Sequence, residues 1–144
     1  MLLELSIRDF AIIEETRIAF EPGMNALTGE TGAGKSILID ALGAVLGERV
    51  GPDVVRTGAK AARIEATFDV TDLAARPEVA ALFDELGVEP EDGLLILGRE
   101  VQASGRSAAR VNGRAMTAGA LGRIGQLLVD IHGQSDHLSL LRPT

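Results

Sequence analysis

Glycines, a lysine and a serine stand close together in the segment GETGAGKS, Gly29–Ser36. This segment satisfies the pattern G-x-x-x-x-G-K-[ST] at every fixed position. Because glycine has no Cβ, the backbone can bend until several N–H groups point inward, and such a nest binds the oxygens of a polyphosphate. The segment therefore predicts a phosphate-binding loop, the Walker A motif, for a nucleoside triphosphate.

Two side chains of the motif have predicted chemical roles. Lys35 is a point charge that is long enough to reach the β- and γ-phosphates, and the Ser36 hydroxyl is a ligand for a partly hydrated Mg²⁺ ion. The helix expected after the loop adds free N–H groups and the positive end of its dipole. We expect ATP and Mg²⁺ to be held by Gly29, Glu30, Thr31, Gly32, Ala33, Gly34, Lys35, Ser36 and Ile37.

A strand before the loop and a helix after it are needed to position these residues. The run MNALT, 24–28, predicts a short buried strand, and apolar residues recur every three or four positions from Lys35 until Gly47, as on a helix face. The rest of the chain predicts a mixed α/β lobe. Its further strands are expected at 2–10, 16–20, 62–70, 94–101 and 107–114, its further helices at 77–87 and 117–131, and a loop at 47–60.

The composition excludes several classes of protein. Of 144 residues 46% are hydrophobic but only 3% are aromatic, so the core must be aliphatic, and the absence of cysteine excludes disulfides and thiolate metal sites. No run reaches the roughly 18 apolar residues of a membrane span. The expected location is the cytoplasm. A net charge of -7 argues against coating nucleic acid by bulk attraction.

One block of the chain is basic in spite of that net charge. Between Arg99 and Arg123 there are five arginines and a single acidic residue, Glu100. Arginine suits planar, bidentate contacts with phosphate, so the block predicts a surface that binds DNA or a partner protein. A solvated hairpin whose charges balance an acidic neighbour is the competing interpretation. The five are Arg99, Arg106, Arg110, Arg114 and Arg123.

Four segments in the right order resemble one known family. ETGAGKSILIDALGAVLGER, 30–49, is similar to the Walker A region of the structural maintenance of chromosomes (SMC) ATPases, in particular of a DNA-repair branch, and the opening 3–29 resembles the first strands of that family. GRSAARVNGR resembles its strand-and-turn segment, and LLVDIHGQSDHLSLL its Q-loop region. The resemblance implies that 1–144 form the N-terminal lobe of an ABC-type ATPase head, an α/β P-loop NTPase lobe with a mixed sheet and flanking helices.

The resemblance also implies the parts that this lobe works with. Gln134 stands where the family has its Q-loop glutamine, so it is expected to contact the Mg²⁺ ion and the attacking water and, with Lys35, to be catalytic. The family continues into a coiled coil and a C-terminal lobe, both absent from these residues, and two heads sandwich ATP in a homodimer. The implied whole protein is a cytoplasmic, nucleoid-associated ATPase that acts on DNA ends in double-strand break repair and recombination, without a membrane. The chain alone is expected to bind ATP weakly and to turn over little of it.

Three alternatives remain open at this point. LLVD, Leu127–Asp130, imitates a Walker B strand, and with Asp130 as a ligand of Mg²⁺ the chain would be a compact, self-sufficient P-loop NTPase or kinase. His132 and His137, with Asp136 between them, suggest a metal site, although loop or packing histidines are the more ordinary explanation for that spacing. Arg56 either approaches the nucleotide or DNA, or is a surface loop charge.

Overall fold

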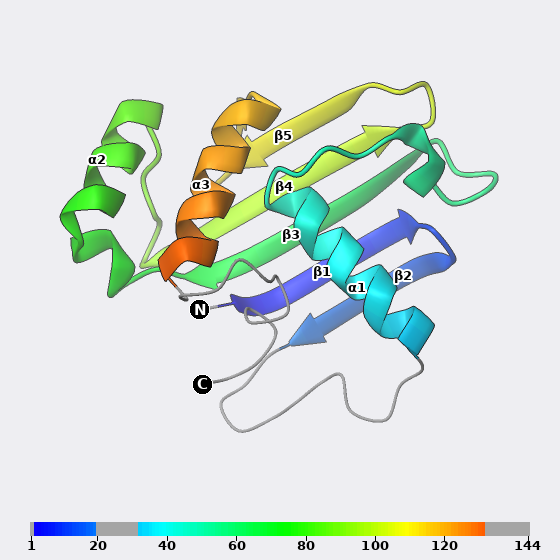
Figure 1. Ribbon diagram of the computed structural model, residues 1–144, viewed down its shortest axis with the longest axis horizontal. Helices are drawn as coiled ribbons and strands as arrows, with labels where there is room; N and C mark the ends of the chain where they lie inside the picture. The colour runs from blue at the N-terminus through cyan, green and yellow to red at the C-terminus, as the bar shows by residue number, and fades with distance from the viewer. Residues whose placement is uncertain (1, 20–31, 132–144) are drawn as a thin grey trace.

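The computed structural model describes residues 2–19 and 32–131, without the side chains of 32–36 and 129–131 (Figure 1). The fold is a single sheet with helices packed on one of its faces. In chain order the elements are β1 (Leu2–Phe10), β2 (Ile13–Ala19), α1 (Gly32–Val45), the 3-10 turn η1 (Pro52–Val54), β3 (Ala61–Asp69), the 3-10 turn η2 (Leu73–Ala75), α2 (Pro77–Leu86), β4 (Leu94–Gln102), β5 (Ser107–Val111), β6 (Arg114–Met116) and α3 (Ala118–Ile131).

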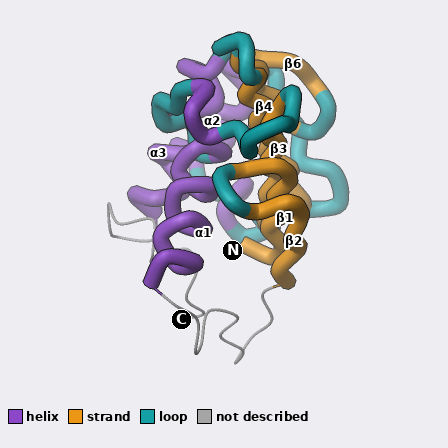
Figure 2. The backbone as a smooth tube through the Cα atoms, turned by 90° about the vertical axis from the view of Figure 1, so that its right-hand side faces the viewer, coloured by secondary structure: helices purple, strands orange, loops and turns teal. Residues whose placement is uncertain are grey.

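The sheet has six strands in the order β2-β1-β3-β4-β5-β6, and each described pair of neighbours is antiparallel. Strands that follow one another in the chain pair as hairpins, except that β3 adds to the free side of β1 after α1 has crossed the sheet. Figure 2 shows the three α-helices as one layer beside the strands. We call the other side of the sheet the open face, because no described helix covers it.

The core lies between the helices and the sheet and is mainly aliphatic, as the composition predicts, but it also holds Phe10, Phe68 and Phe83. On β3, in the middle of the sheet, Ala62, Ile64, Ala66 and Phe68 are buried, while the residues between them are exposed or half-buried. This alternation is what a strand with one covered face requires. α1 contributes Ala41, Leu42, Ala44 and Val45 to the same core.

Most predicted elements are confirmed, with shifted boundaries. α1 begins at Gly32 rather than Lys35, and the second strand begins at Ile13 rather than Thr16. α2 begins at Pro77 and ends before Gly87, whose φ of 70° allows the left-handed cap expected of it. The Asn112-Gly113 turn leads into β6, a strand that the sequence did not predict. The predicted strand at 24–28 lies outside the described residues.

Candidate nucleotide site

The Walker A motif coincides with the start of α1. Gly32 is the first residue of that helix, so the backbone of the last five motif residues, 32–36, is helical. The first turn of a helix has free N–H groups, and phosphates bind there. Gly29, Glu30 and Thr31 lie outside the described residues, as do the side chains of Lys35 and Ser36. The predicted strand-loop-helix context is therefore confirmed at the helix, and the side-chain roles remain predictions.

Side chains from three strands hold α1 on the sheet. The helix packs against β3, β4 and β1, and Ile37, Leu38 and Ile39 in its first half are partly buried against the core. At its C-terminal end the helix is capped by two backbone hydrogen bonds, from Gly47 N to Ala44 O (3.1 Å) and from Glu48 N to Gly43 O (3.0 Å). This is a Schellman cap, and Gly47 takes the left-handed conformation that the cap requires, with φ of 95°.

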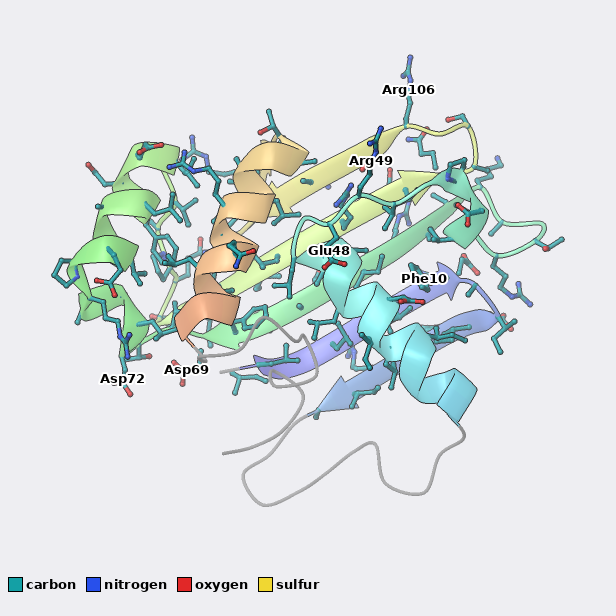
Figure 3. The ribbon with its side chains drawn as sticks, viewed as in Figure 1. Phe10, Glu48, Arg49, Asp69, Asp72 and Arg106 are labelled. Atoms are coloured by element: carbon teal, nitrogen blue, oxygen red, sulfur yellow. The ribbon has the colours of Figure 1, made fainter. Side chains whose placement is uncertain are left out.

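Arg99 on β4 holds the closing turn of α1. Only 5% of this residue is exposed, and its Nη1 donates to the carbonyl oxygens of Ala44 (2.9 Å) and Glu48 (3.0 Å) while its Nε donates to Ser107 Oγ (2.8 Å). Burial lowers the pKa of the Arg99 guanidinium from its ordinary value, because the charged form loses hydration. The positive charge lies at the negative end of the helix dipole, which favours it. Figure 3 shows Glu48 at this end of α1.

The structure corrects the prediction of one basic surface between Arg99 and Arg123. Arg99 is buried, Arg114 Nη1 donates to the carbonyl oxygen of Gly87 (2.7 Å), and Arg123 forms an ion pair with Glu85 on α2. Arg106 is at the β4–β5 turn and projects away from the sheet (Figure 3), whereas Arg110 lies on the open face. The five arginines belong to three strands, a turn and a helix, and they lie on different sides of the sheet, so this block of the sequence does not form one patch.

A different group of arginines gathers on the open face. A shallow concavity of about 610 Å³ there is bordered by Arg8, Arg17, Arg63 and Arg110, which come from four strands. Glutamates interrupt it: Arg17 Nε lies 3.0 Å from Glu4 Oε1, and Arg63 Nε donates to Glu100 Oε1 at 2.7 Å. The face therefore carries cross-strand pairs of opposite charge. Because its members are spread from 8 to 110 in the sequence, only the strand order brings them together.

Arg56 is attached to the β1–β2 hairpin. Its backbone N donates to Asp9 O (2.8 Å), and its guanidinium lies 4.0 Å from the Asp9 carboxylate and 3.9 Å from that of Glu14. These ion pairs are long and partly exposed, so they hold the side chain loosely. The position is a surface loop charge with acidic neighbours, and nothing in these contacts assigns it to a nucleotide or to DNA.

The end of the chain answers one of the open alternatives. Leu127–Asp130 lies inside α3, so the segment that imitates a Walker B strand is helical and the compact NTPase that uses Asp130 is not supported. Gln134, His132, His137 and Asp136 lie outside the described residues. In the described ranges, no three histidine or acidic side chains gather as they would around a metal ion. Figure 1 places the start of α1 and the end of α3 on opposite sides of the helix layer.

Comparison with known proteins agrees with the motif. Residues 4–85 match the AAA domain family. The chain is 49% identical over 141 residues to the DNA repair protein RecN of Halalkalibacterium halodurans, an alignment that covers 98% of this chain and 24% of that protein. It thus spans about a quarter of the length of the curated relatives that it matches. None of the described helices is both long and apolar enough to cross a membrane.

Solved structures show the same fold. The Smc head domain of Pyrococcus furiosus, which has an extended coiled coil and is bound to the C-terminal domain of ScpA, superimposes with a TM-score of 0.67 at 24% identity, covering 85% of this chain and 32% of that chain. A structure from work on ATP-driven dimerization and DNA-stimulated activation of SMC ATPases gives 0.64 at 25% identity, covering 85% and 76%. The α/β fold class, that of a P-loop ATPase lobe from an SMC-type head, is confirmed.

Proposed function

The chain belongs to the AAA domain family, and from that premise we propose that it is the ATP-binding lobe of an SMC-like ATPase that acts in DNA repair. The observation that carries the proposal is the Walker A motif whose last residues open α1. If the motif matched by chance, a helix packed on the sheet would not be expected to begin within it. The RecN relatives support the DNA-repair part of the proposal.

The proposed reaction is transfer of the γ-phosphoryl group to water. The backbone N–H groups at the start of α1 and the Lys35 ammonium would bind the phosphate oxygens, and positive charge there stabilises the charge that spreads over those oxygens as the bond breaks. Ser36, with a hydroxyl oxygen of the kind that Mg²⁺ accepts, would hold the ion, which supplies charge neutralisation between the β- and γ-phosphates. In such reactions the protein contributes mainly position and electrostatics.

Gln134 is proposed to orient the attacking water and to complete the metal site. An amide suits this task because it accepts and donates hydrogen bonds without ionising. Gln134 follows the last residue of α3 by three positions and lies outside the described residues, so its contact with the nucleotide site stays a proposal.

The remaining parts of the proposal concern the whole protein. Because the chain spans about a quarter of its relatives, we propose that 1–144 form the N-terminal lobe and that a C-terminal lobe and a second head complete the ATP site. Dimerization driven by ATP, described for SMC ATPases, supports the homodimer. DNA ends would be held by the whole protein in the cytoplasm, at the nucleoid. Lacking the other lobe and the partner head, the isolated chain would bind ATP weakly and hydrolyse little of it.

Calorimetric titration of the chain with ATP and Mg²⁺ tests the proposal. We expect saturable binding that Lys35→Ala weakens by about tenfold or more, because a charge-assisted contact with phosphate is lost. Lys60→Ala, which removes an exposed lysine just before β3, is the matched control and should bind as the parent does. Absence of binding by the folded parent, or equal binding by Lys35→Ala, would refute the proposal. Rapid Lys35-dependent turnover by the chain alone would show that no second lobe is needed.

A further inference from the structure

The closing turn of α1, which we call the anchor turn and define as Ala44–Glu48, is held from two sides. On the sheet side Arg99 donates to the carbonyl oxygens of its first and last residues, Ala44 and Glu48. On the helix side the turn lies against the backbone of α3, with Gly47 facing Gly122 and Leu46 facing Gly125. The anchor turn, which includes the last two residues of α1, thus combines directional hydrogen bonds with close backbone contacts.

The contact with α3 leaves no room for a side chain at Gly125. A methyl group added at Gly125 would overlap the carbonyl oxygen of Leu46 and lie 2.8 Å from its carbonyl carbon, closer than real Cβ atoms come to other atoms. A methyl group added at Gly122, one helical turn earlier, would lie 3.6 Å from Gly47 O, an ordinary contact. The packing therefore requires glycine at Gly125 but not at Gly122. This requirement explains why Gly125 is present, although glycine weakens a helix by about 1 kcal/mol relative to alanine.

The rest of α1 is held differently, by apolar side chains such as Ala41 and Leu42 against the sheet. These packed side chains keep one face of α1 on the sheet, but no single apolar contact fixes a donor to an acceptor. Hydrogen bonds to carbonyl oxygens have a fixed geometry. The anchor turn therefore adds directional contacts to the apolar packing that positions α1.

The opposite end of the same helix opens the Walker A motif. α1 has 14 residues and is therefore about 21 Å long, and a helix of that length moves as a rigid rod. A shift of the rod along its axis moves the N–H groups at its start by the same amount, and a tilt moves them further. In catalysis a misplacement of about 1 Å can lower the rate about a hundredfold, so small shifts of these N–H groups matter at a phosphate site.

We propose that Arg99 is a positioning residue for the nucleotide loop, acting through the anchor turn and α1 without touching the nucleotide. The inference rests on the proposed function, because it concerns how well the loop fits a triphosphate. Coupling between two sites is reciprocal. If the closed anchor turn raises the affinity for nucleotide by some factor, bound nucleotide must favour the closed anchor turn by the same factor. A ligand that only stabilises the folded state slows exchange at every amide that opens by global unfolding, so slowing confined to the anchor turn is the readout that a merely structural role would not produce.

The first test compares nucleotide affinity among folded variants of the chain, by calorimetry with ATP and Mg²⁺ at a temperature where circular dichroism shows each variant folded. We expect Arg99→Met to raise the Kd by about tenfold and Arg99→Lys, which keeps a donor for the two carbonyl oxygens, to stay within about threefold. Gly125→Ala should raise the Kd as well, and its matched control Gly122→Ala should not. Equal Kd values for Arg99→Met, Gly125→Ala and the parent would overturn the inference.

The second test needs no substitution and stays decisive if Arg99→Met or Gly125→Ala fails to fold. Amide hydrogen exchange of the parent chain is measured with and without ATP and Mg²⁺, at the Gly47 and Glu48 amides whose hydrogen bonds close the anchor turn. We expect saturating nucleotide to slow both amides severalfold, while Val88 N, bonded at the end of α2, keeps its rate. Unchanged exchange at the anchor turn in a parent that binds ATP refutes the inference alone. A parent that binds no ATP refutes the proposed function instead.

Discussion

Arg99 Nη1 donates a 2.9 Å hydrogen bond to the carbonyl oxygen of Ala44, across 55 positions of the chain. This bond joins the middle of the sheet to the end of the helix that begins in the Walker A motif. A buried guanidinium is tolerated here because it is satisfied: two carbonyl oxygens and the Ser107 hydroxyl accept from it. No buried side-chain nitrogen or oxygen lacks a partner in the part of the chain that the structure describes.

We expect Arg99→Met to lower the free energy of unfolding by about 2–4 kcal/mol, because buried carbonyl oxygens lose their donor while methionine fills the space. Urea denaturation followed by circular dichroism measures the change. Arg106→Met removes an arginine from the exposed β4–β5 turn and should stay within about 0.5 kcal/mol of the parent. A loss of the same size in both variants would mean that the charge of the region, and not the anchor turn, sets the stability.

The pair Arg63–Glu100 on the open face predicts a pH dependence of stability. The hydrogen bond from Arg63 Nε holds the pKa of Glu100 below its usual 4.5, so the folded protein binds this proton less readily than the unfolded chain does. The stabilisation is fully present above pH 4.5 and is lost as the pH falls through the lowered pKa of the folded state. Glu100→Gln should therefore show a shallower fall of Tm from pH 5 to pH 3 than the parent.

The matched control for that experiment is Glu65→Gln, which makes the same change of charge on β3. It should retain the steep fall of Tm in acid. If the two variants flatten the fall equally, net charge and not the ion pair with Arg63 is responsible.

The β5–β6 turn provides a prediction about backbone conformation. Asn112 has φ of 49°, its Oδ1 accepts from Ile96 N (2.7 Å), and its Nδ2 donates to Glu89 O (2.8 Å). Asn112→Gly keeps the conformation but loses both side-chain bonds, and should cost about 1–2 kcal/mol of unfolding free energy. Asn112→Ala also forces an alanine into the left-handed region and should cost about 1 kcal/mol more. Thermal or urea unfolding of the two variants decides the order, and an alanine variant at least as stable as the glycine variant would contradict it.

Much of the fold was predictable because local signals agree with tertiary needs. The alternation of Ile64, Ala66 and Phe68 and the Pro77 and Gly87 boundaries of α2 each have one physical cause and were interpreted correctly. The helix at 117–131 was predicted although it contains glycines, and packing explains one of them, since Gly125 must lie against the backbone of Leu46. Close approach between segments is a tertiary fact that no local pattern reports.

The candidate site, like the fold, has a part that could be predicted from the sequence and a part that could not. The Walker A residues form a local motif, so their position at the start of α1 could be predicted. The role of Arg99 could not, because it depends on which face of β4 is covered and on which helix lies there. The sequence does not show which face of the sheet each side chain takes. The block Arg99–Arg123 was therefore predicted to form one surface, although Arg99 and Arg110 point to opposite sides of the sheet.

The order of the strands has a consequence for how the chain is made. Every pairing among the described strands except β1 with β3 joins consecutive strands, and that one exception can form once β3 has followed α1 and its loop in synthesis. Mostly local pairing favours rapid folding, and N-terminal units generally fold first on the ribosome. The central strands, with α1 enclosed between their pairings, can thus be assembled before translation reaches α3.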